Sequence, residues 1–143
     1  MTIQQISVFL ENRAGQLAEI TDILAAHDID LRAIHIAETT DYGVLRIITS
    51  RPQEAANILL EKGCILSMTP VLAAAVPDKP GGLAKLLAVV AQAGIDIEYM
   101  YSMFGHGDGL AYMIFRVNDA EHLESVLAAN GITPATGADL GIG

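Results

Sequence analysis

Two short segments of the chain combine a glycine with polar neighbours in a way that suits the binding of a small charged molecule. They span residues 11–16 and 77–82, and in each the glycine, Gly15 or Gly81, follows an alternating hydrophobic run and opens a helical one. The first backbone N–H groups of a helix have no partner inside the helix, and together with the helix dipole they favour a carboxylate. Both segments are therefore candidate sites for an anionic ligand group.

Polar side chains close to these glycines are candidates for further contacts. The candidate binding residues are Asn12, Arg13, Ala14 and Gly15 in the first segment, Asp78, Lys79, Pro80 and Gly81 in the second, and Asp30 and Asp96, which each begin a later strand. A simpler interpretation stays open for four of them. Asn12 and Asp78 are also suitable helix caps, and Asp30 and Asp96 are also ordinary turn residues.

The two segments belong to an internal repeat. Residues 10–18 align with residues 76–84 at an offset of 66, and the match continues from Ile29-Asp30 to Ile95-Asp96. The chain is thus expected to hold two homologous domains, residues 1–69 and 70–143. The seam is placed near Pro70, because proline cannot donate to a sheet ladder and biases the preceding residue toward extended geometry.

The hydrophobic pattern changes its period in the same order in both halves. The expected strands are residues 6–10, 29–38 and 44–49 and one beginning at Cys64, then 72–76, 95–104, 110–117 and a short final strand. The expected helices are residues 17–27, 52–63, 82–92 and 120–129. This order predicts an α+β fold of two tandem ferredoxin-like βαββαβ units, with antiparallel sheets and helices on one face.

Two of the expected strands are largely apolar on both faces. In residues 44–48 and 110–117, apolar side chains occupy alternate positions of either parity, whereas a sheet with one wet face would show polar residues at every second position. The face without helices is therefore expected to be buried too. Either the two halves or a second copy of the chain would cover it, and a homodimer is predicted.

Composition excludes several classes of function. More than half of the residues, 52%, are hydrophobic, and the net charge is −9, which disfavours binding to nucleic acids and to anionic membrane surfaces. No apolar run is long enough for a transmembrane helix, and the first residues lack an export signal, so a cytoplasmic protein is expected. A single cysteine, Cys64, cannot form an internal disulfide or a structural zinc site.

No catalytic set is found in the sequence. The serines lack a glycine-flanked nucleophile elbow and Cys64 lacks a paired histidine signature, so neither an enzyme nor a cofactor is predicted. His106 lies in a glycine-rich hairpin, where a metal site is less favoured than a plain turn. The pair Tyr99 and Tyr101 is expected to pack or to contact a second subunit, with a pocket wall as the weaker alternative.

The repeated motifs resemble those of the ACT domain. Glu11 to Ala18, followed after a helix by Ile29-Asp-Leu, is similar to the small regulatory subunits of acetohydroxyacid synthase, which carry a comparable Glu-Asn-x-x-Gly-x-Leu. Pro77-Asp-Lys-Pro-Gly-Gly-Leu is a characteristic variant of the same loop. The resemblance covers nearly the whole chain. Ala14 stands where the family commonly has proline.

The resemblance implies a stand-alone regulatory protein that binds a free amino acid, or a related small carboxylate, between two ACT units. In the family, the first loop of one unit holds the ligand and a polar residue at the start of the second strand of its partner completes the site. Asp30 and Asp96 match that strand start, and a carboxylate there suits an ammonium group. The alternative is a structural dimerisation module, or a regulatory subunit of an amino-acid metabolic enzyme, without a working ligand site.

Overall fold

The chain forms two compact α+β units. A computed structural model describes residues 2–11, 13–38, 42–105 and 108–143. The N-terminal unit consists of Gln4–Thr69 with Gly141–Gly143, and the C-terminal unit consists of Pro70–Leu140 with residues 2 and 3. Each end of the chain therefore belongs to the unit formed by the opposite half.

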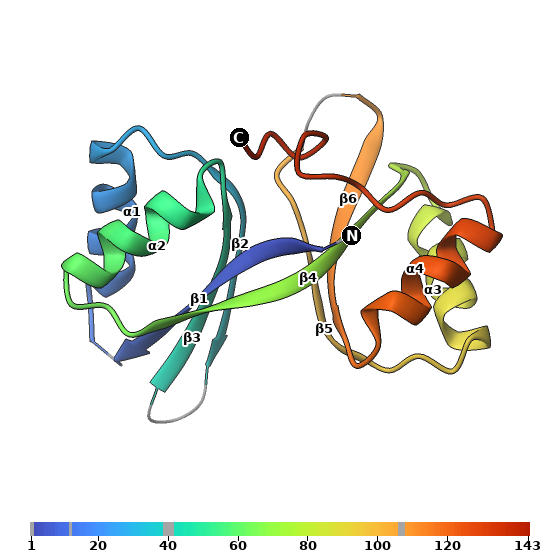
Figure 1. Ribbon diagram of the computed structural model, residues 1–143, viewed down its shortest axis with the longest axis horizontal. Helices are drawn as coiled ribbons and strands as arrows, with labels where there is room; N and C mark the ends of the chain where they lie inside the picture. Colours follow the sequence, from blue (N-terminus) through green and yellow to red (C-terminus); the bar gives the residue numbers. More distant parts are fainter. Residues whose placement is uncertain (1, 12, 39–41, 106–107) are drawn as a thin grey trace. The chain divides into compact units, whose positions relative to one another are not determined.

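The N-terminal unit has the strand order β2-β3-β1-β4 (Figure 1). Its elements are β1 (Ile3–Glu11), α1 (Gln16–Ala26), β2 (Leu31–Glu38), β3 (Tyr42–Thr49), α2 (Pro52–Glu61) and the first residues of β4 (Leu66–Pro77). β3 pairs antiparallel with both β1 and β2. Alternate side chains of β1 and β3 form the core with the apolar sides of the two helices, for example Val8 and Ile47 with Leu24 and Leu59.

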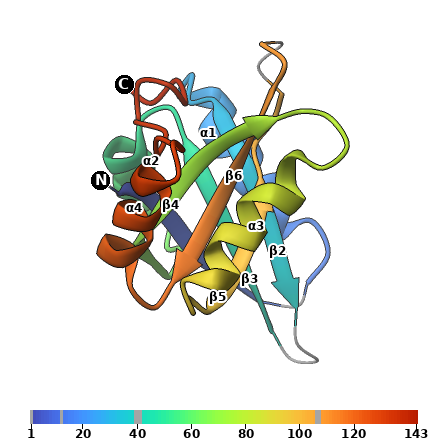
Figure 2. The ribbon, with the colours of Figure 1, turned by 90° about the vertical axis from the view of Figure 1, so that its right-hand side faces the viewer.

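The C-terminal unit repeats this arrangement with the strand order β4-β6-β5. It adds α3 (Gly82–Gln92), β5 (Ile97–Ser102), β6 (Leu110–Val117) and α4 (Ala120–Ala129). α3 and α4 contact each other and lie on the same side of β6 (Figure 2). Their buried residues Leu86 and Leu123 pack with Phe115 of β6. The predicted α+β class and the two ferredoxin-like units are confirmed.

The short strand expected after α4 is reduced to a single bridge. Pro134 bridges Ala74, and the N–H of Ala135 donates to the carbonyl of Ala73 at 2.7 Å. Pro134 has no N–H to donate, so it cannot extend a ladder in both directions.

The break expected at Pro70 is absent, because β4 runs without interruption from Leu66 to Pro77. Pairing with β6 begins only at Leu72, so the missing N–H of Pro70 interrupts no bond to that strand. The carbonyl of Pro70 accepts a hydrogen bond of 2.8 Å from Arg116. The division of the chain into independent domains at this point stays a prediction.

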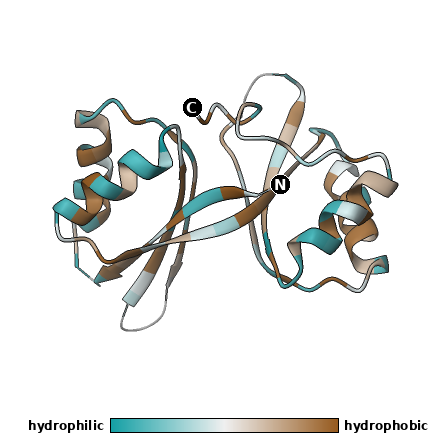
Figure 3. Ribbon diagram, in the orientation of Figure 1, coloured by the Kyte–Doolittle hydropathy of each residue, from teal (hydrophilic) through white to brown (hydrophobic). Residues whose placement is uncertain are grey.

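Side chains on both faces of the central strands are buried. Ile48 and Ile114 point away from the two helix-packed cores, and each has 0% of its surface exposed. The hydropathy colouring of Figure 3 shows apolar residues along the strands, whereas the helices alternate apolar and polar segments. The expectation that the helix-free faces are buried is confirmed at these positions, and the predicted homodimer stays a prediction.

Candidate functional site

The loop from β1 to α1 presents an open helix start. Gly15, with φ 87° and ψ −9°, lies in the left-handed region that favours glycine, and no described side chain caps the helix after it. The N–H of Arg13 donates to the carbonyl of Glu11 at 2.8 Å, which tightens the loop. Ala14 and Gly15 are exposed. Asn12 lies outside the described residues.

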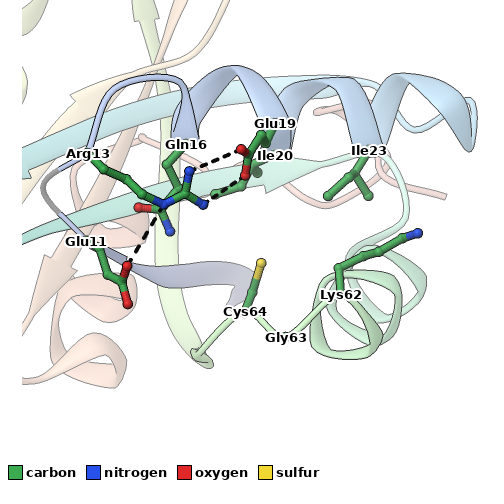
Figure 4. A pocket seen from close by; sticks show the side chains of 9 residues that line it. All are labelled: Glu11, Arg13, Gln16, Glu19, Ile20, Ile23, Lys62, Gly63 and Cys64. Carbon is green, nitrogen blue, oxygen red and sulfur yellow. Dashed lines mark hydrogen bonds and ion pairs between the residues drawn. The ribbon is translucent and has the colours of Figure 1, made fainter.

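The guanidinium of Arg13 is already engaged by the protein. It donates to both carboxylate oxygens of Glu19, at 3.1 and 2.9 Å, and lies 3.9 Å from Glu11 (Figure 4). The hydrogen bond from Arg13 lowers the pKa of Glu19, and the charge of Arg13 lowers it further. Glu19 thus occupies two of the five N–H groups of Arg13 and offsets its charge, which leaves less of that charge for a ligand carboxylate.

The loop from β4 to α3 has the same backbone with free side chains. Gly81 has φ 89° and ψ −11°, again without a side-chain cap on the helix, and the N–H of Lys79 donates to the carbonyl of Pro77 at 2.9 Å. Asp78, Lys79 and Pro80 are exposed. The side chains of Asp78 and Lys79 form no hydrogen bond or ion pair with a described residue. The interpretation of Asp78 as a helix cap is therefore wrong.

Each predicted aspartate lies far from the loop of its own unit. Glu11 pairs with Tyr42 at one end of β3, whereas Leu31, next to Asp30, pairs with Thr49 at the other end. The same holds for Asp96 and the second loop, at opposite ends of β6. The structure thus does not join a loop with the aspartate of the same unit, and the expected site between two units stays a prediction.

The two aspartates differ in their surroundings. The carboxylate of Asp30 accepts a hydrogen bond of 2.9 Å from Arg32, and its backbone N–H donates to the hydroxyl of Ser50 at 3.0 Å. Asp96 is exposed, and its side chain has no partner in the described part of the chain. Asp96 is therefore the better placed of the two to accept a bond from an ammonium group.

A small cavity that the sequence did not predict lies beside α1 (Figure 4). Its volume is about 180 Å³, and it is lined by Glu11, Arg13, Gln16, Glu19, Ile20, Ile23, Lys62, Gly63 and Cys64. The side-chain oxygen of Gln16 is buried and has no hydrogen-bond partner among the described residues. Partial burial raises the pKa of the Cys64 thiol, and the Glu19 carboxylate adds to this effect, so the thiol is protonated at neutral pH.

A larger cavity lies at the equivalent place beside α3. Its volume is about 510 Å³, and it is lined by Ala75, Val76, Pro77, Gly82, Lys85, Leu86, Val89, Leu110, Asn130, Gly131, Ile132 and Thr133. Position 82 requires glycine, because a Cβ there would overlap with the carbonyl oxygen of Pro77. No side chain therefore enters the cavity from this position. The sequence held one sign of this larger cavity: Gly82 stands at the position that corresponds to Gln16 at the offset of 66.

The remaining candidates form no second site. Tyr99 and Tyr101 stack with ring centroids 6.4 Å apart, and Tyr101 is buried, which agrees with a packing role. No group of three or more metal-binding side chains is found among the described residues, which exclude His106. Within the same residues, every helix is too short or too polar to cross a bilayer.

Several solved structures share this fold. The chain is 36% identical to protein BT0572 from Bacteroides thetaiotaomicron, with 99% of this chain and 96% of that one covered and a TM-score of 0.91. It is 20% identical to the ligand-free regulatory subunit of aspartate kinase from Thermus thermophilus, with 90% of each chain covered and a TM-score of 0.66. At this second identity the likeness shows the fold alone.

A third structure is a complex. The chain is 15% identical to E. coli aspartokinase III in complex with lysine and aspartate, with 90% of this chain but only 31% of that one covered and a TM-score of 0.50. Among curated proteins, none matches the chain. The family model described as ACT domain pair matches residues 1–140. The chain therefore belongs to the ACT domain pair family.

Proposed function

We propose that the protein is a regulatory sensor that binds a free amino acid and transmits its binding through the arrangement of its ACT units. One observation carries the proposal: no described residue gives a side-chain cap to either of the two helices that follow Gly15 and Gly81. The N–H of Gly82 already donates to the carbonyl of Lys79 at 3.1 Å, so the ligand carboxylate would use the N–H groups that follow it in α3 and those at the start of α1. An exposed aspartate such as Asp96 is suited to the ligand ammonium.

The second loop is the better binding segment of the two. The carboxylate of Asp78 and the ammonium of Lys79 have no partner among the described residues, whereas Arg13 in the first loop is held by Glu19. A ligand carboxylate at Arg13 competes with the Glu19 carboxylate for the charge of the guanidinium, which weakens its binding. We therefore propose that the loop containing Gly81 binds first.

The relatives support an amino acid as the ligand class. The E. coli aspartokinase III structure holds lysine and aspartate, and the Thermus thermophilus relative is a regulatory subunit. A screen of the twenty amino acids by thermal denaturation tests the proposal. A ligand at 100 times its dissociation constant should stabilise the fold by about 2.7 kcal/mol. If none of the twenty shifts the midpoint, the proposal of an amino-acid sensor is wrong.

The aspartates are tested by calorimetric titration of the best ligand. We expect Asp96→Ala to weaken binding by roughly tenfold or more, because a charge-assisted hydrogen bond is lost. Asp30→Ala should have a smaller effect, since Arg32 already donates to the carboxylate of Asp30. Unchanged affinity in both variants would leave these aspartates as turn residues.

A regulatory subunit of an amino-acid metabolic enzyme is the second candidate. It is favoured by the match over 90% of both chains to a regulatory subunit of aspartate kinase. We place the protein in the cytoplasm and expect a homodimer. Light scattering at high micromolar concentration would test the homodimer. In this second case the protein would change the activity of an added enzyme without any amino acid being present.

A further inference from the structure

The cavity beside α3 has the size of a small-molecule site. Its volume of about 510 Å³ falls within the range of about 300–1,000 Å³ that is usual for small-molecule pockets. All of its lining residues come from the C-terminal unit, from α3, the end of β4, the start of β6 and the segment after α4. The cavity therefore exists within one unit and does not depend on the placement of the other.

The walls of this cavity are apolar with one cation. Side chains of Val76, Leu86, Val89 and Ile132 provide apolar surface, and Lys85 is the only charged lining residue. The Lys85 ammonium has no ion pair or hydrogen bond with a described residue. One side-chain N–H of Asn130 donates to the carbonyl of Val126 at 2.8 Å. Lys85 is exposed, and its positive charge favours a negatively charged group at this cavity.

In the N-terminal unit, the protein itself supplies a positive and a negative side chain at the equivalent cavity beside α1. There, Arg13 and Glu19 form a bidentate ion pair beside a cavity of about 180 Å³. At the offset of 66, their counterparts are Lys79 and Lys85, which carry like charges and cannot pair with each other. A carboxylate that arrives from outside would supply to these lysines the charge that Glu19 supplies to Arg13.

We infer that the cavity beside α3 binds a small carboxylic acid that has an apolar body and no ammonium group, with its carboxylate on Lys85. The absence of an acidic lining residue sets this ligand class apart from amino acids, whose ammonium would lose its water here without a partner. The inference is separate from the proposed amino-acid site, which uses the exposed loop and Asp96.

Hexanoate is a suitable probe, with hexanamide and hexylamine as neutral and cationic matches. Calorimetry and amide chemical shifts on the full chain should show binding of hexanoate, binding at least about tenfold weaker for hexanamide, and none for hexylamine. The shifted amides should belong to α3 and to residues 130–133. Equal affinity for hexanoate and hexanamide, or shifts elsewhere, would overturn the inference.

Two variants test the walls, each with a matched control in the other unit. Lys85→Gln should weaken hexanoate binding at least about tenfold, and Val89→Phe should fill the cavity and abolish it. The controls are Lys62→Gln and Ile23→Phe, which change the equivalent cavity and should leave binding intact.

The variants also separate this inference from the proposed function. Asp96→Ala should leave hexanoate affinity unchanged, whereas it should weaken amino-acid binding. If Lys85→Gln is folded by its amide spectrum and binds hexanoate as the parent protein does, the site assignment is wrong. A failed amino-acid screen together with intact, Lys85-dependent hexanoate binding would retain this inference and remove only the amino-acid sensor.

Discussion

The cavities beside α1 and α3 occupy the same place in two units of the same fold, yet they are closed in different ways. Glycines at the helix starts have almost identical backbone angles, 87° and −9° at Gly15 and 89° and −11° at Gly81. Beside α1, Gln16 and the Arg13–Glu19 pair reduce the space to about 180 Å³. Beside α3, Gly82 and an unpaired Lys85 leave about 510 Å³.

The comparison shows which part of the repeat is fixed by the backbone and which part is free to change. Glycine is favoured before both helices, because Gly15 and Gly81 have positive φ and a residue with a Cβ would be strained in this conformation even though the space around it is open. The lining side chains carry no such requirement, so a neutral, self-paired cavity in one unit corresponds to an apolar cavity with a positive charge in the other. Substitutions that exchange features between the two units can break or sharpen this comparison.

The largest effect is expected at Gly82. Gly82→Ala should lower the free energy of unfolding by about 1–3 kcal/mol, because the new Cβ meets the carbonyl oxygen of Pro77, a backbone atom that cannot move aside cheaply. Urea denaturation measures the change. Gln16→Ala is the matched control and should stay within about 0.5 kcal/mol of the parent protein. Equal costs at both positions would mean that the two loops are not distinguished by this contact.

A smaller effect is expected just after the ends of α1 and α3. Asp28 and Gly94 are equivalent, and both have positive φ, 56° and 69°. Gly94→Ala should therefore destabilise the protein by about 1 kcal/mol, since a Cβ is disfavoured in this region although nothing lies near it. Asp28→Gly should stabilise it by less than about 1 kcal/mol. Thermal denaturation of the two variants, measured in parallel, checks both signs.

The Arg13–Glu19 pair predicts a pH dependence that its counterparts Lys79 and Lys85 cannot produce. The hydrogen bond from Arg13 and its charge lower the pKa of Glu19 in the folded state below its ordinary value. The stabilisation by this pair is therefore present above the ordinary pKa of a glutamate and is lost as the pH falls through the lowered folded value. An NMR titration should find the low pKa in the parent protein and an ordinary one in Arg13→Met. A glutamate pKa that is insensitive to Arg13→Met would contradict the pair.

Much of the fold was accessible from the sequence because it depends on local patterns. α3 and α4 have the predicted bounds, Gly82–Gln92 and Ala120–Ala129, since hydrophobic period, glycine and caps all agree there. The continuous strand β4 was missed because Pro70 reads as a strand break, and its tolerance depends on where pairing with β6 begins. Register of this kind is a tertiary property.

The site was accessible only in part. The two glycines with positive φ, Gly15 and Gly81, could be placed, because each stands between an alternating hydrophobic run and a helical one. The engagement of Arg13 by Glu19 and the cavity beside α3 could not, since both depend on how side chains six or more residues apart meet across a loop. The repeat itself held a usable clue, which was the opposite charge of Glu19 and Lys85 at equivalent positions.

The smallest effect is expected at Cys64, which lines the cavity beside α1, whereas its counterpart beside α3 is Ile132. Partial burial raises the pKa of the thiol, and the Glu19 carboxylate raises it further, so little of the reactive thiolate is present near pH 7. Alkylation by iodoacetamide should be severalfold slower in the folded protein than in urea. Glu19→Gln should raise the folded rate only slightly, because burial is the larger cause and remains. A folded rate equal to that in urea would show that the thiol is reached as freely as in the unfolded chain, and that the cavity beside α1 is more open than the structure describes.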